Sequence, residues 1–175
     1  MADFQRNIWA PWRMEYIDSL VEDSDGGCFL CHIREHAQED EHRYVLWRSP
    51  QTLVLLNRFP YSSGHVLIAP VEHVPQLDDL PDTVLLELMH RTRDVRRILE
   101  HALQAQGFNV GINLGRCAGA GLPGHLHIHV VPRWGGDTNF MAVLADVKVI
   151  PQSLTAVRRL FLDAAGELGL DADQA

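Results

Sequence analysis

Hydrophobic positions fall into five short runs and two longer periodic stretches along the chain. The short runs are rich in Val, Leu and Ile and are bounded by Gly, Pro, Ser or Asn, which is typical of strands. We expect these strands at 44–47, 52–56, 65–69, 108–113 and 125–131. In two longer stretches, 81–104 and 152–168, apolar residues return every three or four positions, which predicts amphipathic helices. Since the strands cluster with few helices between them, the pattern predicts an α+β fold with an antiparallel five-stranded sheet, one long helix and a C-terminal helix.

Size and charge narrow the possible functions. The chain has 175 residues, about the length of one domain. Its 15 Lys and Arg residues against 23 Asp and Glu residues leave a net charge of −8, which argues against binding to a nucleic-acid backbone. The opening residues lack the apolar core of a signal peptide, and no later run reaches the ~18 apolar residues of a membrane span. We therefore expect a cytoplasmic protein with neither nucleic acid nor a membrane as its partner.

Three histidines alternate with apolar residues in the last expected strand. His125, His127 and His129 would share one face of that strand, while the residues between them would face a helix. An imidazole can act as a nucleophile, a base or a proton donor near neutral pH. Two kinds of site fit the pattern: a zinc site built from these imidazoles, and a phosphoryl site in which one histidine attacks phosphorus. The glycine-rich loop 115–121 favours the phosphoryl site, because its backbone N–H groups can turn toward an anion.

A cysteine pair stands near the N-terminus, in the sequence Cys28-Phe29-Leu30-Cys31-His32. This spacing occurs in haem attachment, in redox pairs and in zinc sites. Haem attachment needs export and a redox pair is expected in a βαβ setting, so we favour zinc over these and over two buried thiols without metal. A structural zinc site needs four sulfur or nitrogen ligands, which leaves two histidines to be supplied. His32 is the candidate nearest in sequence.

These motifs together resemble the histidine-triad (HIT) family of nucleotide hydrolases and transferases. The resemblance covers roughly 43–136 and has three parts: the alternating histidines, an Asn57-Arg58-Phe59-Pro60 segment followed by Gly64-His65-Val66-Leu67, and Asn113-Leu114-Gly115 with Ala118-Gly119. The segments 9–13, 107–111 and 132–137 are similar to a bacterial branch of the family that includes diadenosine tetraphosphate phosphorylases. The resemblance implies a HIT-like version of the expected sheet and a dinucleoside polyphosphate as the substrate.

The resemblance also implies roles for individual residues. His127 would attack the α-phosphate and form a nucleotidyl-histidine intermediate, which phosphate or water would resolve, and His129 would bind or protonate the leaving oxygen. The implied substrate-binding residues are Asn57, His65, Asn113, Gly119, Gly121 and Trp134, with His65 orienting the histidines and Trp134 available to stack on a base. Gly121 stands where the family usually has a hydroxyl or amide side chain. Alternative functions are an adenosine 5′-phosphoramidate hydrolase and a non-catalytic nucleotide-binding regulator.

Zinc-containing relatives imply the rest of the metal site. By this resemblance Cys28, Cys31, His73 and His125 hold a structural zinc ion, with His32 competing with His73 for the fourth place. Mg²⁺ is a candidate to accompany the substrate, and the family's habit of pairing implies a homodimer or a larger homo-oligomer. The expected organisation is a single domain over 1–175. It has a core at 43–136, an N-terminal extension at 1–42 that carries the zinc-binding cysteines, and a C-terminal helical extension at 137–175.

Overall fold

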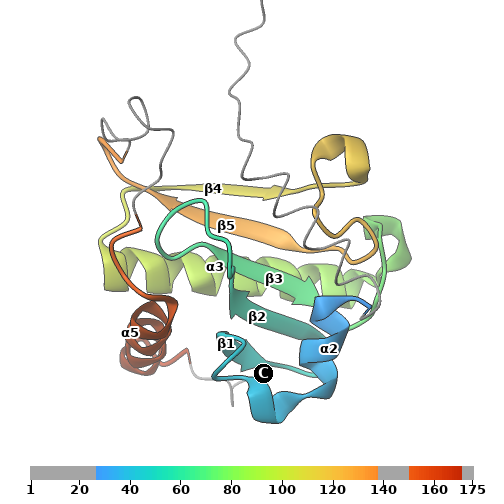
Figure 1. The fold of residues 1–175 in the computed structure, drawn as a ribbon, viewed down its shortest axis with the longest axis horizontal. Helices are drawn as coiled ribbons and strands as arrows, with labels where there is room; N and C mark the ends of the chain where they lie inside the picture. The colour runs from blue at the N-terminus through green and yellow to red at the C-terminus, as the bar shows by residue number, and fades with distance from the viewer. Residues whose placement is uncertain (1–26, 138–149, 171–175) are drawn as a thin grey trace, which may run out of the picture.

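The computed structural model describes residues 27–137 and 150–170. They contain a five-stranded antiparallel sheet with the strand order β1-β2-β3-β5-β4 (Figure 1). The strands are β1 (Val45–Arg48), β2 (Thr52–Leu56), β3 (Val66–Pro70), β4 (Gly107–Ile112) and β5 (Ile128–Arg133). The expected α+β class and the antiparallel sheet are therefore confirmed. The motif expected at 9–13 and the outer parts of both extensions lie outside the described residues.

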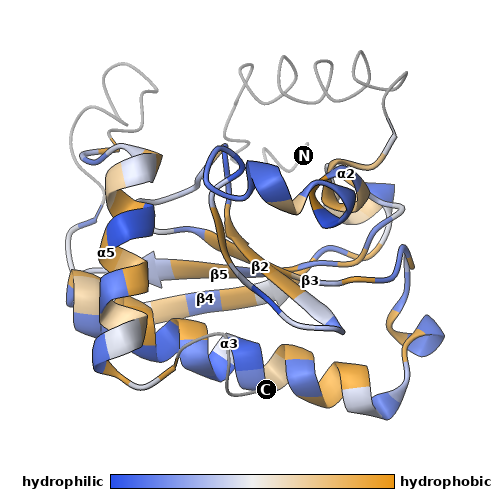
Figure 2. Ribbon diagram, turned by 90° about the horizontal axis from the view of Figure 1, so that it is seen from below, coloured by the Kyte–Doolittle hydropathy of each residue, from blue (hydrophilic) through white to orange (hydrophobic). Residues whose placement is uncertain are grey.

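Helices cover both faces of the sheet (Figure 2). The short helix α2 (Phe29–Glu35) lies on one face, and the long helix α3 (Asp82–Leu103) lies on the other. Helix α5 (Leu154–Glu167) packs against α3 and β1. Short 3₁₀ turns complete the described elements: η2 (Ala37–Glu39), η3 (Leu77–Asp79) and η4 (Arg116–Ala118). The two expected helices are confirmed, with boundaries that shift by one or two residues. Of the helices described, none is long and apolar enough to cross a membrane.

Strands β2 and β3, in the middle of the sheet, are buried on both faces, which explains their continuous hydrophobic runs. Alternate residues along the strands separate into two buried clusters. One cluster lies against α3 and α5 and includes Val54, Val66, Ile68, Ile128, Val130, Leu99 and Phe161. The other lies against α2 and consists of Leu30, Ile33, Val45, Leu53, Leu55, Leu67 and Ala69. The chemistry-bearing side chains described below share the second face, because His129 pairs across the strands with Leu67.

A tight turn brings the chain into β3. Gly64 adopts a φ of +81°, and a Cβ atom there would lie 2.6 Å from Leu103 Cδ1 and 3.0 Å from Phe161 Cζ. Only glycine adopts this backbone conformation readily and also leaves room for α3 and α5 to pack against the turn.

The expected start of the last strand is wrong. The alternating pattern predicted strand from position 125, but β5 begins at Ile128, the first residue paired with both β3 and β4. The backbone N–H of Leu126 instead donates to the carbonyl of Val74, in the loop that follows β3. This loop thus takes the place of a neighbouring strand for the backbone of Leu126, and His125 lies before the start of β5.

Candidate functional site

His127 is held by the backbone of its own segment. Its side chain is buried, and Nδ1 lies 2.9 Å from the carbonyl oxygen of His125. A carbonyl oxygen can only accept, so Nδ1 carries the proton and Nε2 carries a lone pair. Burial lowers the pKa of His127 below its usual value of 6.5, and the hydrogen bond to the carbonyl opposes this effect. The neutral imidazole, with a nucleophilic Nε2, is therefore the form of His127 near neutral pH.

A chain of hydrogen bonds assigns the proton of His129. The backbone N–H of Tyr61 donates to Nδ1 of His65 at 3.1 Å, so that atom is an acceptor. Neutral His65 then has its proton on Nε2, which lies 3.0 Å from Nδ1 of His129. His129 accepts this hydrogen bond at Nδ1, and its own proton in the neutral form is on Nε2. Its ring lies 4.8 Å from that of His127, so a ring nitrogen with a lone pair and one that carries a proton belong to neighbouring side chains.

Two further residues support this chain of histidines. Asn57 is buried, and its Nδ2 lies 3.2 Å from Nδ1 of His65. The Tyr61 ring stacks on His65 with centroids 4.8 Å apart and on His129 with centroids 5.9 Å apart. His65 itself is 1% exposed and bonds to Nδ1 of His129, so its position is compatible with orienting the ring of His129. The sequence analysis did not single out Tyr61, because nothing in a linear pattern shows which ring will cover a given imidazole.

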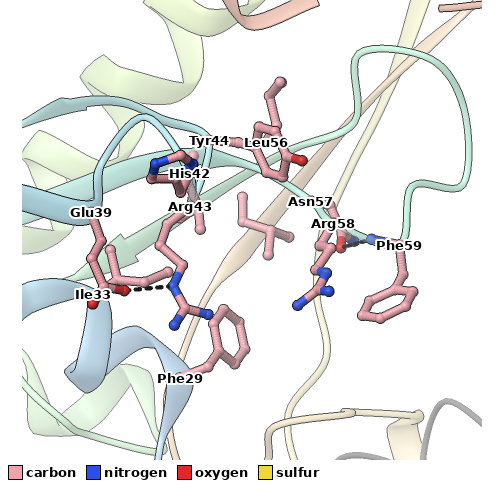
Figure 3. Close-up of a pocket in the computed structure, with 12 residues that line it drawn as sticks. Phe29, Ile33, Glu39, His42, Arg43, Tyr44, Leu56, Asn57, Arg58 and Phe59 are labelled. Carbon is pink, nitrogen blue, oxygen red and sulfur yellow. Dashed lines mark hydrogen bonds and ion pairs between the residues drawn. The ribbon is translucent and has the colours of Figure 1, made fainter. Parts of the chain in front are cut away.

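A pocket of about 520 Å³ opens beside these residues, between α2 and the sheet (Figure 3). It shares Asn57 with the hydrogen-bonded chain and Leu67 with the cross-strand pair of His129. Figure 3 shows that Phe29 comes from α2 and Phe59 from the loop that follows β2. The lining residues are Phe29, Ile33, Glu39, His42, Arg43, Tyr44, Leu55, Leu56, Asn57, Arg58, Phe59 and Leu67.

The pocket combines apolar walls with a charged edge. Glu39 and Arg43 form an ion pair there, with Arg43 Nε 3.0 Å from Glu39 Oε2. Small-molecule sites in proteins are typically apolar clefts of about 300–1,000 Å³ with a few polar groups. Apart from Asn57, none of these lining residues was expected, because α2, β2 and the loop after β2 meet only in the folded chain.

The glycine-rich loop lies beyond β4. Asn113 Nδ2 is 3.5 Å from the carbonyl oxygen of Gly119, so these two expected substrate-binding residues are neighbours. The backbone N–H groups of Ala118 and Gly119 donate to the carbonyls of Gly115 and Arg116 within the turn. Those two N–H groups are thus already paired within the turn. They are not turned toward an anion, as the glycine-rich sequence of the loop would allow. Gly121 is half-buried in the bend that leads toward His125.

Trp134 lies away from the pocket that contains Asn57. Its Nε1 donates to the carbonyl of Leu103 at 3.1 Å, at the C-terminal end of α3. The ring lines a separate hollow of about 370 Å³ with Ser62, Ser63, Leu103, Gly135, Gly136, Asp137, Pro151 and Gln152.

Four potential metal ligands converge near the start of α2. One ligand atom from each of Cys28, Cys31, His73 and His125 lies within 4.8 Å of all the others. Nδ1 of His125 is 3.2 Å from Sγ of Cys28 and 3.7 Å from Sγ of Cys31, and Nδ1 of His73 is 3.3 Å from Sγ of Cys31. Tetrahedral zinc with bonds of 2.0–2.3 Å leaves about 3.3–3.8 Å between neighbouring ligand atoms. These three separations therefore fit a Cys₂His₂ zinc site.

The hydrogen bonds of His125 support this fit. Its Nε2 lies 2.9 Å from the carbonyl oxygen of Pro70, so the proton is on Nε2 and the lone pair of Nδ1 faces the sulfurs. Burial lowers the pKa of His125 to about 4, so the ring is neutral, as a ligand must be. Burial likewise raises the pKa of the Cys28 thiol to about 11. A metal ion would lower it again, since zinc binds the thiolate.

The neighbourhood of His73 explains why this histidine reaches the cluster. A Cβ atom on Gly124 would come within 3.3 Å of Nε2 of His73, so glycine leaves the room that this ring occupies. His32, the competing candidate from the sequence, is turned elsewhere. Its Nε2 lies 3.4 Å from Glu39 Oε2, and its ring stacks on His36 with centroids 4.1 Å apart.

Comparisons with known proteins agree with this geometry. A model of the HIT domain matches residues 38–136. An AP-4-A phosphorylase from Mycobacterium tuberculosis is 38% identical over 162 residues, which cover 90% of this chain and 83% of that protein. The chain belongs to the HIT family. Its family resemblance, inferred from the alternating histidines and the two neighbouring motifs, is therefore confirmed.

Other HIT proteins are similar to this chain in sequence or in structure. An asymmetrical bis(5′-nucleosyl)-tetraphosphatase from Schizosaccharomyces pombe is 36% identical over 93 residues, or 53% of this chain and 50% of that protein. The crystal structure of a Zn-bound histidine triad family protein from Mycobacterium smegmatis is similar with a TM-score of 0.66 and 26% identity. That similarity covers 82% of this chain and 96% of the other. It confirms the expected HIT-like arrangement of the sheet and helices.

Proposed function

We propose that this HIT protein is an enzyme that cleaves dinucleoside polyphosphates, such as diadenosine tetraphosphate, at the α-phosphate. The observation that carries the proposal is the pairing of His127 and His129. Their rings lie 4.8 Å apart, and the hydrogen bonds of each leave Nε2 of one as a nucleophile and Nε2 of the other as a hydrogen-bond donor. The AP-4-A phosphorylase and the tetraphosphatase among the relatives support the same substrate class.

In the first step Nε2 of His127 attacks the α-phosphorus. A phosphorus–nitrogen bond forms, and the bond from phosphorus to the bridging oxygen breaks. The Nε2–H of His129 donates a hydrogen bond to the departing oxygen, which stabilises the negative charge that develops on the leaving nucleotide. His65 acts through His129, because its Nε2–H donates to His129 Nδ1 and keeps the proton of His129 on the substrate side.

In the second step the nucleotidyl group leaves His127. Water attack yields AMP, whereas attack by inorganic phosphate yields ADP; diadenosine tetraphosphate gives ATP as the other product in both cases. Attack by water releases one proton to the solvent, and the Nε2–H of His129 stays available as a hydrogen-bond donor to the phosphoryl group. Charge stabilisation and positioning dominate such chemistry, so the phosphates need further donors. Asn113, Gly119 and Gly121 are proposed to lie against them, with Asn113 Nδ2 as a donor, since the N–H of Gly119 already donates to the carbonyl of Arg116. Mg²⁺ is a candidate to accompany the substrate.

The pocket of about 520 Å³ would hold the nucleoside on the side of the attacked phosphate. Its aromatic and aliphatic walls suit the faces of a base, and Asn57 sits where the pocket meets the histidines. Trp134 lines a different hollow, so we assign it to the second nucleoside and not to the one in this pocket. Cys28, Cys31, His73 and His125 would hold a zinc ion with a structural role, tying α2 to the segment that carries His127.

Incubation with diadenosine tetraphosphate, with and without inorganic phosphate, tests the proposal. Chromatography of the nucleotides then separates the possible reactions. ADP plus ATP only in the presence of phosphate identifies a phosphorylase, and AMP plus ATP in either condition identifies a hydrolase. Faster turnover of adenosine 5′-phosphoramidate would identify a phosphoramidase instead. Tight nucleotide binding without product would identify a non-catalytic regulator and refute the proposal.

We also propose that the protein forms a homodimer. In the described part of the chain β4 ends the sheet and pairs with β5 alone. Large apolar side chains are exposed close to this edge and on α3: Val110 is 50% exposed, Leu86 57% and Met89 58%. Such groups favour association with a second copy. Light scattering tests this, and the mass of a monomer at micromolar concentration would contradict it.

A further inference from the structure

Helix α2 presents chemically different residues on two sides. Cys31, together with Cys28 immediately before the helix, lies beside His73 and His125. Phe29, which stands between the two cysteines in sequence, lines the nucleoside pocket (Figure 3). The potential metal ligands and one wall of the pocket therefore belong to the same turn of helix.

The two ends of α2 are held in different ways. At the C-terminal end, the Arg48 guanidinium donates to the carbonyl of Ile33 at 2.6 Å and to that of Arg34 at 3.3 Å, and it pairs with Asp40. Ile33 is also 3% exposed and packs in the cluster beneath the helix. This end is anchored by ordinary packing and hydrogen bonds.

The N-terminal end carries the two cysteines of the candidate metal site. Gly27 precedes it with a φ of +79° and no atom within 4 Å of the position of a Cβ. The thiols of Cys28 and Cys31 contact the imidazoles of His125 and His73, and Cys28 also packs with Phe29 against the apolar cluster beneath the helix. Leu30 is buried, but its neighbour Phe29 is only half-buried and faces the pocket. A metal ion bound by all four ligands would replace weak thiol–imidazole contacts with strong, directional bonds.

We propose that metal binding by Cys28, Cys31, His73 and His125 positions Phe29 against the nucleoside, so that the metal and the nucleotide bind cooperatively. The inference rests on the proposed nucleotide function and adds a specific role for Phe29 as a positioning residue. Loss of the contact between Phe29 and the base should be measurable. An aromatic ring stacked on a base contributes about 1–3 kcal/mol, equivalent to about 5- to 150-fold in affinity. Without the metal, Phe29 keeps its apolar packing but loses the constraint from the two cysteines, and we expect AMP to bind about tenfold more weakly.

Binding of AMP, measured by calorimetry, tests the inference. AMP does not react, so its dissociation constant is separate from any effect on catalysis through the His125 carbonyl that orients His127. Zinc-loaded and chelator-treated protein are compared for the wild type, for Phe29→Ala and for Phe59→Ala. Phe59 lines the same pocket but comes from the loop after β2, so it is the matched control. The metal should strengthen AMP binding about tenfold in the wild type and in Phe59→Ala, and by less than about twofold in Phe29→Ala.

A reciprocal measurement needs only the folded, loaded protein. By thermodynamic linkage, AMP must strengthen zinc binding by the same factor by which zinc strengthens AMP binding. Competition with a chromophoric chelator measures the zinc affinity with and without saturating AMP. The expected gain is about tenfold in the wild type and in Phe59→Ala, and it is absent in Phe29→Ala.

The outcomes separate this inference from the function on which it rests. Equal AMP affinity in loaded and metal-free protein overturns the coupling and leaves the proposed enzyme intact. Loss of the coupling in both Phe variants overturns the role of Phe29, because the metal would then act on the whole pocket. Failure of the loaded protein to bind AMP at all overturns the nucleotide function and the inference with it.

Discussion

The proton on His129 depends on His65, and two substitutions of His65 separate its two hydrogen bonds. In His65→Asn, the side-chain oxygen can replace Nδ1 and accept from Tyr61 N–H, but nothing donates to His129. In His65→Gln, the side-chain amide can replace Nε2 and donate to His129, but the acceptor for Tyr61 is lost. Each variant thus keeps one of the contacts measured at 3.1 Å and 3.0 Å and removes the other.

The expected magnitudes follow from those contacts. One hydrogen bond contributes about 0.5–1.5 kcal/mol, or about 2- to 13-fold in rate if it is needed in the transition state. We expect kcat of His65→Asn to fall about tenfold and kcat of His65→Gln to stay within about threefold. Conversely, His65→Gln leaves the donors of Tyr61 and buried Asn57 without their acceptor, which lowers the free energy of unfolding by about 1–3 kcal/mol.

The assay is steady-state cleavage of diadenosine tetraphosphate, with urea unfolding measured on the same preparations. The p-nitrophenyl ester of AMP is a useful second substrate, because its leaving group needs little help from a hydrogen-bond donor. His65→Asn should lose much less activity on that ester than on the dinucleotide. An unchanged kcat of His65→Asn on the dinucleotide, or an equal loss in His65→Gln, would refute the assignment of the proton on His129.

Three further predictions concern the nucleophile, the metal and the turn before β3. His127→Ala should lower turnover by at least about 10³-fold with an unchanged circular dichroism spectrum, and a variant that keeps most of its activity would exclude His127 as nucleophile. Elemental analysis should find about one zinc per chain and much less in Cys28→Ser, whose melting temperature should also fall, since structural zinc contributes about 10 kcal/mol or more; near-zero zinc in both proteins would contradict the site. Gly64→Ala should lower the free energy of unfolding by about 2–4 kcal/mol because of its positive φ and the overlap with Leu103, and thermal unfolding close to that of the wild type would contradict this.

Local patterns predicted most of the elements correctly. Helix α3 and helix α5 follow from apolar residues at helical spacing, because one stripe of each packs on the sheet or its neighbour. The strands follow from short apolar runs, since β2 and β3 are covered on both faces. The start of β5 could not be predicted in this way. The alternation of His125 with its neighbours is compatible with a strand, but the loop after β3 binds the backbone there through Val74.

In the candidate site, too, some residues could be recognised from the sequence and others could not. His127, His129 and the cysteine pair are recognisable because their spacing in sequence is itself unusual. The choice of His73 over His32, the position of Tyr61 on His129 and the place of Phe29 in the pocket are not recognisable from spacing. Each depends on a contact between two segments that are far apart in the chain, and a local sequence pattern does not predict such a contact.

Periodicity and residue type are local properties, so they were enough to predict the fold class and to recognise the motifs that resemble the HIT family. The tertiary structure alone decided how those residues are coupled. The 3.0 Å contact of His65 with His129, the 2.9 Å contact of His127 with the His125 carbonyl and the meeting of Cys31 with His73 arise where separate segments pack. Those contacts assign each proton and each lone pair, since an imidazole becomes a donor or an acceptor only through the partner that it faces.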